Sequence, residues 1–168
     1  LKSSGKDISI AIIEKASEVG AHSLSGAIVD PKSLNELFPE LKNSDFPFEY
    51  PVNKEFMYYL TKTNKFSIPF IPKPMSHHGC YITSIGKLTR WLEKKCEKEG
   101  VDIFSGFPGS KILYNESNNS VMGVRTADRG IDKKGNKKAE YEPGVDIISK
   151  VTILGEGSRG SLTKTLIE

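Results

Sequence analysis

The residues best suited to chemistry are three glycines near the end of the chain and one acid near its beginning. Gly155, Gly157 and Gly160 spell G-x-G-x-x-G, between a predicted strand at 150–154 and the start of a predicted helix. Glycines let a ligand approach the backbone closely, and free N–H groups at a helix N-terminus attract phosphate. A dinucleotide fingerprint also needs a following strand that ends in an acid about 20 residues later. The motif alone therefore leaves open a nucleotide contact or a tight strand-to-helix turn.

The acid is Glu14, which lies where a carboxylate would contact the ribose of a dinucleotide. It follows the apolar run Asp7–Ile13 (DISIAII), whose β-branched residues predict a strand buried on both faces of a parallel sheet. An acid at the end of the second strand of a Rossmann unit accepts hydrogen bonds from the ribose. A plainer interpretation, in which Glu14 and Lys15 are only a charged strand end, stays open.

Other constellations of reactive side chains do not predict a site. His77, His78 and Cys80 are near neighbours in the chain, so their side chains do not converge easily on one ion, and no second Cys/His cluster supplies further ligands. No serine lies in a nucleophile-elbow pattern. These patterns therefore predict neither a metal site nor a nucleophilic catalytic set.

Composition excludes several classes of protein. The chain has 168 residues, 37% of them hydrophobic and 27% charged, which is typical of a globular domain. Its net charge of +3 is small and evenly mixed, and no aromatic residues interleave with the basic run 133–138 (KKGNKK), so we expect no nucleic acid partner. No apolar run approaches the length of a transmembrane helix. Because the chain starts at Leu1 rather than Met, we also expect a fragment of a longer protein.

Periodicity disappears between Gly20 and Pro74, a stretch that holds seven of the nine prolines. Long loops of this kind are more often functional than passive. A short helix is predicted at Pro31–Leu37 with Asp30 as its N-cap. Phe56–Leu60 and Phe66–Ile71 are predicted to be short strands.

Large apolar side chains gather in the first half of this proline-rich stretch. Two interpretations remain open for them: they cap the core, or they form an exposed patch that contacts a membrane or an apolar ligand. The residues are Leu34, Leu37, Phe38, Leu41, Phe46 and Phe48.

Regular structure returns with a helix whose apolar stripe is Ile85, Leu88, Leu92 and Cys96, ending near Gly100. The remaining pattern predicts five strands and one loop, with an antiparallel hairpin between the second and third strands. The strands are Val101–Phe104, Lys111–Tyr114, Val121–Ala127, Val145–Ile148 and Lys150–Leu154, the last one buried, and Arg129–Glu142 is a solvated loop.

Several blocks of the sequence, in order along nearly its whole length, resemble the electron-transfer flavoprotein:ubiquinone oxidoreductase family. The most specific block is Gly20–Ala27 (GAHSLSGA). The other blocks are Ile12–Ala16, Leu37–Pro39, His78–Gly79, Tyr81–Ile82, Leu88–Trp91, Gly100–Val101, Val124–Gly130, Lys150–Ile153 and Glu156–Gly157.

The resemblance implies an enzyme that passes electrons from reduced electron-transfer flavoprotein, through FAD and a [4Fe–4S] cluster, to ubiquinone. It implies a monotopic membrane protein on the matrix face of the mitochondrial inner membrane, or on a bacterial cytoplasmic membrane. The primary glycine fingerprint would lie before Leu1 and the cluster cysteines beyond Glu168, so neither Cys80 nor Cys96 is expected to bind iron. The protein part would hold the flavin and tune it.

Residue by residue, the resemblance implies that Glu14, with Lys15 beside it, contacts the FAD ribose. Ser25 and Gly26 would approach the flavin, and Arg90 would lie near the FAD phosphates. The later FAD contact would be Gly155, Glu156 and Gly157, with Gly160 matching the glycine pattern only incidentally. Residues facing the quinone or the membrane would be Leu34, Leu37 and Phe38.

The expected fold class is α/β, a fragment of a Rossmann-like FAD-binding domain of the glutathione-reductase/hydroxylase type with an antiparallel β insertion. Residues 1–20 would belong to the FAD domain, 21–84 to a long segment on the quinone and membrane side, and 85–168 to a return to the FAD domain with a β-hairpin. Two alternatives stay open: a related geranylgeranyl-reductase-type or aromatic-hydroxylase flavoenzyme, and an inactive fragment that binds a partner.

Overall fold

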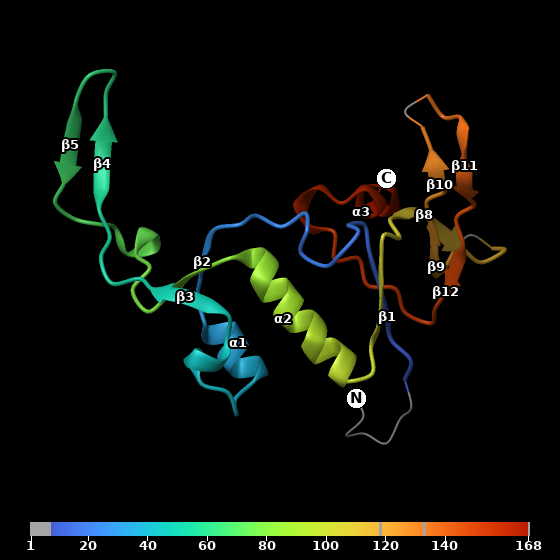
Figure 1. Cartoon of the computed structure of the whole chain (residues 1–168), viewed down its shortest axis with the longest axis horizontal. Coiled ribbons are helices and arrows are strands. Elements are labelled where there is room, and N and C mark those ends of the chain that lie inside the picture. Colours follow the sequence, from blue (N-terminus) through green and yellow to red (C-terminus); the bar gives the residue numbers. More distant parts are fainter. Residues whose placement is uncertain (1–7, 118, 133, 168) are drawn as a thin grey trace. The chain divides into compact units, whose positions relative to one another are not determined.

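The structure is a computed structural model that describes residues 8–117, 119–132 and 134–167 (Figure 1). It divides the chain into two compact units. Unit 1 comprises the chain up to Glu18 together with Val101 onwards, and unit 2 comprises Val19–Gly100. Three residues of predicted segments, Asp7, Asn118 and Lys133, lie outside the described residues. The protein is mixed α/β with several antiparallel sheets.

Unit 1 contains two strands that the sequence predicts, and they pair in parallel. β1 (Ala11–Glu14) pairs with β7 (Asp102–Ser105), with Glu14 opposite Ser105. The predicted burial of β1 on both faces is wrong, because Ile12 is 41% exposed. In the described part of the chain β1 pairs with β7 alone, so a two-stranded sheet leaves one face open.

The antiparallel sheet of unit 1 confirms the predicted hairpin. β8 (Gly109–Tyr114), β9 (Val121–Thr126) and β12 (Asp146–Ile148) pair in the order β12-β9-β8. Helix α3 (Ser161–Ile167) follows the 3-10 helix η4 (Gly157–Arg159) and packs on β8. The core of the unit consists of Ile112, Val124 and Leu162, with Ile13, Val121 and Leu154 packed against it.

Two predictions in unit 1 are wrong. The predicted loop Arg129–Glu142 contains a hairpin, in which β10 (Arg129–Ile131) pairs with β11 (Lys137–Glu142). The predicted buried strand Lys150–Leu154 is not a strand, and its Ile153 is 88% exposed. The hairpin is stabilised by backbone hydrogen bonds and needs no apolar pattern, whereas an apolar segment cannot form a strand without a partner edge.

Unit 2 has a small antiparallel sheet in the order β2-β6-β3. Its strands, β2 (Ala27–Val29), β3 (Phe48–Pro51) and β6 (Tyr81–Thr83), are three or four residues long. Strands this short carry too little alternation to be recognised, and the sequence pattern predicts none of them. Two 3-10 helices, η2 (Asn43–Asp45) and η3 (Lys73–Met75), lie in the proline-rich connections.

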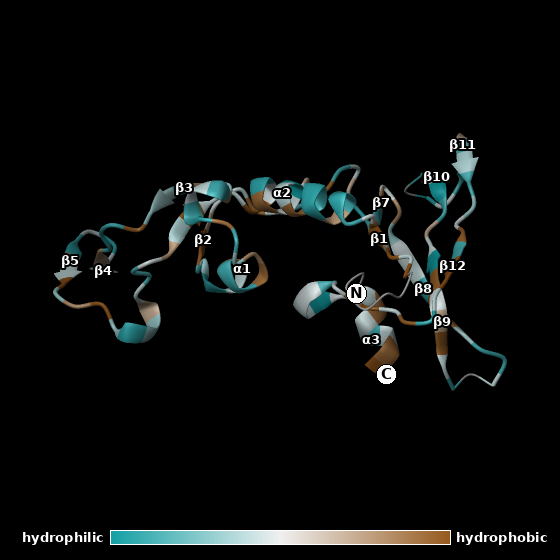
Figure 2. Cartoon of the chain, turned by 90° about the horizontal axis from the view of Figure 1, so that it is seen from below, coloured by the Kyte–Doolittle hydropathy of each residue, from teal (hydrophilic) through white to brown (hydrophobic). Residues whose placement is uncertain are grey.

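The helices of unit 2 largely follow the prediction. α2 (Ile85–Lys98) begins after Ser84, whose Oγ accepts a hydrogen bond from the Lys87 N–H at 3.4 Å. Hydrophobic and hydrophilic stretches alternate along α2 (Figure 2), as expected for an amphipathic helix. α1 (Lys32–Leu37) starts one residue later than predicted, with Pro31 as its N-cap. Asp30 still accepts a hydrogen bond from the Lys32 N–H, at 3.0 Å.

Aromatic rings form the core of unit 2, which we call the aromatic cluster: Phe38, Phe46, Phe48, Tyr81 and Trp91. Phe46 is buried, with its ring centroid 5.2 Å from Trp91 and 5.4 Å from Phe48. Phe38 lies edge-on to Trp91 at 5.3 Å, and Phe48 stacks on Tyr81 at 4.6 Å. The cluster therefore joins the loop before β3 to strand β6 and helix α2.

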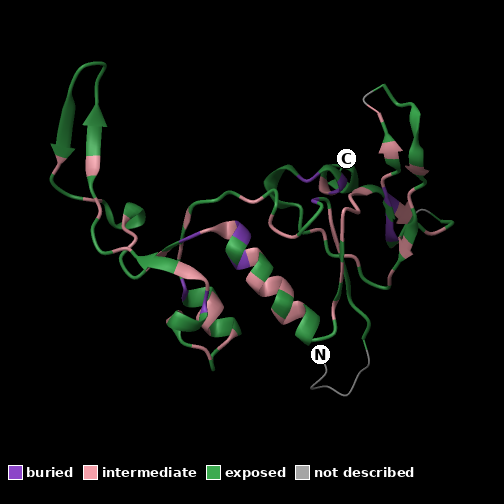
Figure 3. Ribbon diagram, viewed as in Figure 1, coloured by how far each residue is buried: buried purple, intermediate pink, exposed green. Residues whose placement is uncertain are grey.

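A hairpin in unit 2 packs chiefly on itself. Its strands, β4 (Met57–Leu60) and β5 (Lys65–Ile68), confirm the two strands predicted in this region. Figure 3 shows the hairpin as largely exposed. In the described residues, no helix is long and apolar enough to span a membrane.

Candidate functional site

The candidate site residues divide between the two units. Unit 1 contains Glu14, Lys15, Gly155, Glu156 and Gly157. Unit 2 contains the others, which are Ser25, Gly26, Leu34, Leu37, Phe38 and Arg90.

Glu14 ends β1 in a position fixed by backbone hydrogen bonds. Its carbonyl accepts from the Phe107 N–H at 2.9 Å, and the carbonyl of the buried Ala16 accepts from the Gly106 N–H at 2.7 Å. The side chain is partly buried, and its Oε1 accepts from the Ala16 N–H at 2.7 Å. Its Oε2 accepts no hydrogen bond from the described residues.

Glu156 has a local role that sequence reasoning missed. Its carboxylate accepts hydrogen bonds from the N–H groups of Leu162 and Thr163, at 3.3 and 2.8 Å, and from the Thr163 hydroxyl at 2.9 Å. These bonds, the Thr163 N–H foremost, hold the pKa of Glu156 below its ordinary value. The carboxylate thus takes the place at the start of α3 that the glycine pattern offers to a phosphate.

Gly160 makes this cap possible. A Cβ at this position would lie 2.5 Å from the Cβ and from one carboxylate oxygen of Glu156. A glycine is therefore required by the contact with Glu156, whereas Gly155 and Gly157 have open space around them. The third glycine of the pattern serves the helix cap.

We expect Glu156→Ala to destabilise the end of unit 1 by about 1–2 kcal/mol, the usual cost of losing an N-cap. Urea unfolding of the chain at neutral pH measures this loss, and Glu156→Gln, which keeps one acceptor oxygen, should lose less. Because the folded pKa is lowered, the contribution is present above the unfolded pKa and disappears as the pH falls through the folded value. If the difference in unfolding free energy between wild type and Glu156→Ala persisted in acid, this role would be contradicted.

In unit 2, the segment Gly20–Gly26 begins in contact with the first turn of α2. A Cβ at Gly20, where φ is +82°, would lie 2.5 Å from the Thr89 hydroxyl and 2.8 Å from the Gly86 carbonyl. The Arg90 guanidinium lies beside the same turn, 3.6 Å from the position of a Cβ at Gly86. Arg90 makes no ion pair with the residues that the structure describes.

Ser25 and Gly26 are exposed, and no atom lies within 4 Å of a Cβ built at Gly26. The backbone here is open to close approach by a ligand. In the described part of the chain, no hydrogen bond joins either residue to Arg90.

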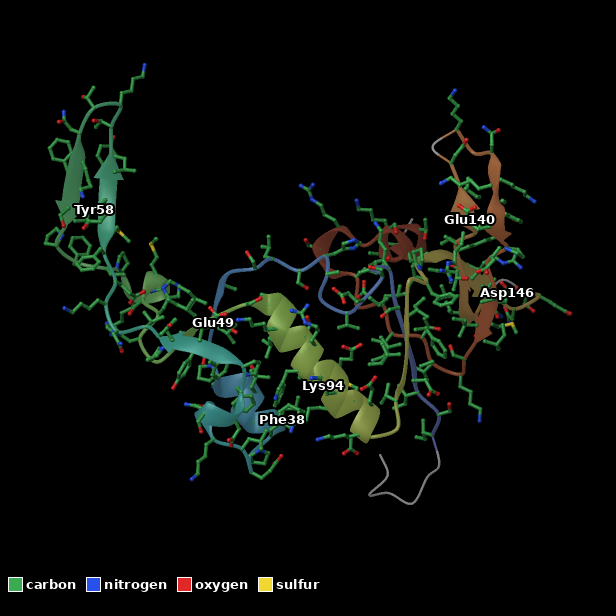
Figure 4. The ribbon with its side chains drawn as sticks, viewed as in Figure 1. Phe38, Glu49, Tyr58, Lys94, Glu140 and Asp146 are labelled. Atoms are coloured by element: carbon green, nitrogen blue, oxygen red, sulfur yellow. The ribbon has the colours of Figure 1, made fainter. Side chains whose placement is uncertain are left out.

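The three predicted membrane- or quinone-side residues differ in their surroundings. Phe38 packs in the aromatic cluster, with Lys95 5.8 Å from its ring centroid, and Figure 4 labels it together with Lys94 of α2. Leu34 is half-buried, and Leu37 is 65% exposed. Of the six apolar residues in this stretch, Phe46 is buried in the core.

Exposed large apolar side chains of unit 2 also gather at the β4–β5 hairpin, which the sequence did not single out. The side chains of this apolar hairpin project from both of its sides, as Figure 4 shows around Tyr58. Its exposed large side chains are Phe56, Tyr58, Tyr59, Leu60, Phe66 and Phe70. The continuous apolar run of β4 is typical of a buried strand, so it gives no sign of exposure.

A single carboxylate clamps the base of this apolar hairpin. Glu55 precedes β4, and its oxygens accept hydrogen bonds from the His77 N–H at 3.0 Å and lie 2.6 Å from His77 Nδ1. The Ser76 hydroxyl donates to Glu55 at 3.4 Å. The His77 N–H above all, with the ring, keeps the pKa of Glu55 below its ordinary value.

A shallow hollow of about 490 Å³ lies beside this clamp. Among its lining residues are Glu55, Phe56, Ile68, Phe70 and His78. No group of three His, Cys, Asp or Glu side chains in the described ranges could hold a metal ion.

No family model matches the chain. Curated relatives do match: it is 42% identical over 164 residues to the mitochondrial electron transfer flavoprotein-ubiquinone oxidoreductase of Dictyostelium discoideum. It is 43% identical over 171 residues to the enzyme of that name from Pseudomonas aeruginosa, and 40% identical over 163 residues to the mitochondrial one of Mus musculus. These alignments cover 96–98% of this chain but only 26–30% of the relatives. The chain therefore spans about a quarter to a third of the length of the curated relatives it matches.

Proposed function

Since nearly the whole chain is homologous to one segment of electron transfer flavoprotein-ubiquinone oxidoreductases, we propose that it serves as the corresponding part of such an enzyme. The enzyme would pass electrons from reduced electron-transfer flavoprotein, through FAD and a [4Fe–4S] cluster, to ubiquinone. It would act at the matrix face of the mitochondrial inner membrane or at a bacterial cytoplasmic membrane. The similarity over 96–98% of the chain carries this proposal.

Unit 1 would supply the ribose side of a Rossmann-like FAD site. Glu14 stands at the carboxyl end of a parallel strand, which is where such sheets bind nucleotides. Its Oε1 is held by Ala16, which fixes the direction of Oε2, the oxygen that would accept a ribose hydroxyl. Lys15 is exposed next to it.

Gly155 and Gly157 would meet the FAD through their backbones. Both have open space around them, so a ligand could approach closely. The carboxylate of Glu156 is hydrogen-bonded to α3. Glu156 would therefore support FAD binding indirectly, by holding this turn in place.

Unit 2 would supply Ser25, Gly26 and Arg90. The Gly26 backbone is open, which suits a segment that approaches the flat isoalloxazine ring. Arg90 is exposed, and a guanidinium with no carboxylate partner among the described residues suits a phosphate group. When bound, FAD supplies the electron transfer chemistry, and these residues would hold and orient it.

The cluster ligands would come from elsewhere in the enzyme. Cys80 and Cys96 are both free thiols, and in the described ranges neither belongs to a group of three His, Cys, Asp or Glu side chains that could hold a metal ion. We therefore assign no iron ligand to this chain.

Residues 21–84 would form the membrane and quinone side. Leu37 and the apolar hairpin are exposed here, and an exposed apolar surface of this kind is typical of proteins that lie on a bilayer. Leu34 and Phe38 would support this side from α1 and the aromatic cluster.

We expect Glu14→Ala in the full-length enzyme to weaken FAD retention about 10- to 100-fold, because hydrogen bonds to a charged group are worth about 1.5–3 kcal/mol. Flavin absorbance per protein after gel filtration measures this, with circular dichroism to show that the fold is retained. Glu18→Ala, an exposed acid four residues further on, is the matched control. Unchanged flavin content in Glu14→Ala would remove the ribose assignment.

Assays of the full-length enzyme separate this function from its alternatives. Reduction of ubiquinone with reduced electron-transfer flavoprotein as donor is expected. Reduction of an isoprenoid lipid or hydroxylation of an aromatic ring would instead indicate the related flavoenzymes.

A further inference from the structure

We propose that the apolar hairpin β4–β5 binds bilayers that carry anionic lipid, and that its lysines select these bilayers over neutral ones. The proposal rests on the membrane association proposed above and adds the class of lipid. It concerns residues 52–76, which include both strands and their flanking turns.

The charge of this segment is unlike that of the rest of the chain. It carries four lysines, Lys54, Lys62, Lys65 and Lys73, against the single acid Glu55. This excess equals the net charge of +3 of the whole chain, so the other residues are together neutral. Glu55 is already engaged by His77, which leaves the lysines as the charges that the segment presents. A local excess of lysine attracts the negative surface of a bilayer.

The apolar side chains favour a lipid surface as the partner. Phe56 and Leu60 project from one face of the hairpin, and Tyr59 and Phe66, paired across the strands, project from the other; all four are exposed. A flat protein surface would cover only one face of the hairpin, whereas the interface of a bilayer can surround both faces. Aromatic and leucine side chains beside lysines are typical of peptides that insert at this depth.

Lysine and aromatic groups are also placed together. The Lys65 Nζ lies 4.5 Å from the centroid of the Tyr58 ring, and the tip between the strands carries Lys62. With tyrosine at the interface, the ammonium group of Lys65 would reach the phosphate level of the bilayer. The clamp of Glu55 and His77 holds the base, and among the described elements the strands pack chiefly on each other, which leaves their side chains exposed in this chain.

The test is sedimentation of the 168-residue chain with vesicles of phosphatidylcholine alone, or with 30% phosphatidylglycerol added. Lys62→Gln/Lys65→Gln should weaken binding to the anionic vesicles about 25-fold, since each lysine near the surface contributes about fivefold. Binding to neutral vesicles should stay unchanged. The matched control is Lys134→Gln/Lys138→Gln, which removes two lysines from the other exposed hairpin region, in unit 1.

Leu60→Ser/Phe66→Ser separates this inference from the proposed membrane association, because it should weaken binding to both kinds of vesicle. Equal affinity of the wild type for neutral and anionic vesicles would overturn the lipid selectivity and leave membrane association standing. Absence of binding to either vesicle would overturn both. Lysine-dependent binding to an acidic protein, without binding to vesicles, would replace the lipid by a protein partner and overturn the proposal.

Discussion

Gly123→Ala is expected to lower the free energy of unfolding of the chain by about 3 kcal/mol or more, among the largest effects of a single substitution. Gly123 lies in β9 with φ of +152°, and it pairs with Ile148 of β12. A Cβ at this position would lie 2.0 Å from the Ile147 carbonyl oxygen. That oxygen is backbone, so the strands must separate to admit the methyl group.

Urea unfolding at neutral pH measures the effect, and Gly155→Ala is the matched control. At Gly155 no atom lies within 4 Å of a Cβ, and its φ is not in the left-handed region. We expect that variant to unfold within about 0.5 kcal/mol of wild type, as for most surface changes. A Gly123→Ala variant of wild-type stability would show that β12 does not pair with β9 in this register.

Phe46→Ala should destabilise the chain by about 3–5 kcal/mol, the usual cost of removing a buried aromatic ring. Phe46 is 5% exposed and is in ring contact with Phe38, Phe48 and Trp91, so its loss leaves a cavity in the aromatic cluster. The near-ultraviolet circular dichroism of the single tryptophan should change as well, because Trp91 loses its neighbour.

Phe70→Ala is the matched control for this prediction, since the same residue type is removed from a position that is 67% exposed. Its unfolding free energy should stay within about 0.5 kcal/mol of wild type. Similar losses from the two variants would mean that Phe46 is not the centre of a core, and would count against the packing of unit 2.

Long periodic elements could be predicted from the sequence. The stripe from Ile85 to Cys96 defines α2 within two residues of its observed end, because the apolar spacing and the glycine after the helix both mark it. The hairpin β8–β9 is likewise recognised by two alternating runs around a polar turn.

Segments whose state depends on distant partners could not be predicted. The pattern of Lys150–Leu154 is that of a buried strand, yet in the described part of the chain no edge pairs with it. The charged stretch Arg129–Glu142 forms a hairpin because Asp132 accepts from the N–H groups of Lys134 and Asn136, which fixes the turn. Such side chain-to-backbone bonds carry no signal in hydropathy.

Parts of the candidate site could also be predicted from the sequence, and other parts could not. The position of Glu14 at a strand end follows from the apolar run before it, and β1 confirms that placement. The cap of α3 by Glu156 depends on the approach of Gly160, a three-dimensional contact that the glycine pattern does not encode. The exposure of the β4–β5 hairpin is equally a property of what surrounds the strands, which their sequence does not contain.

In the sequence, unit 2 is inserted between β1 and β7, and this order has a consequence for how the chain folds. These parallel strands can pair only after the polypeptide closes a loop of about 90 residues, and the entropy of that closure opposes pairing until the loop is shortened. Local contacts such as those of α2 and the hairpins form much faster than distant ones. We therefore expect unit 2 to fold first and the β1–β7 pair to form last, so that the strand carrying Glu14 is the final element to become ordered.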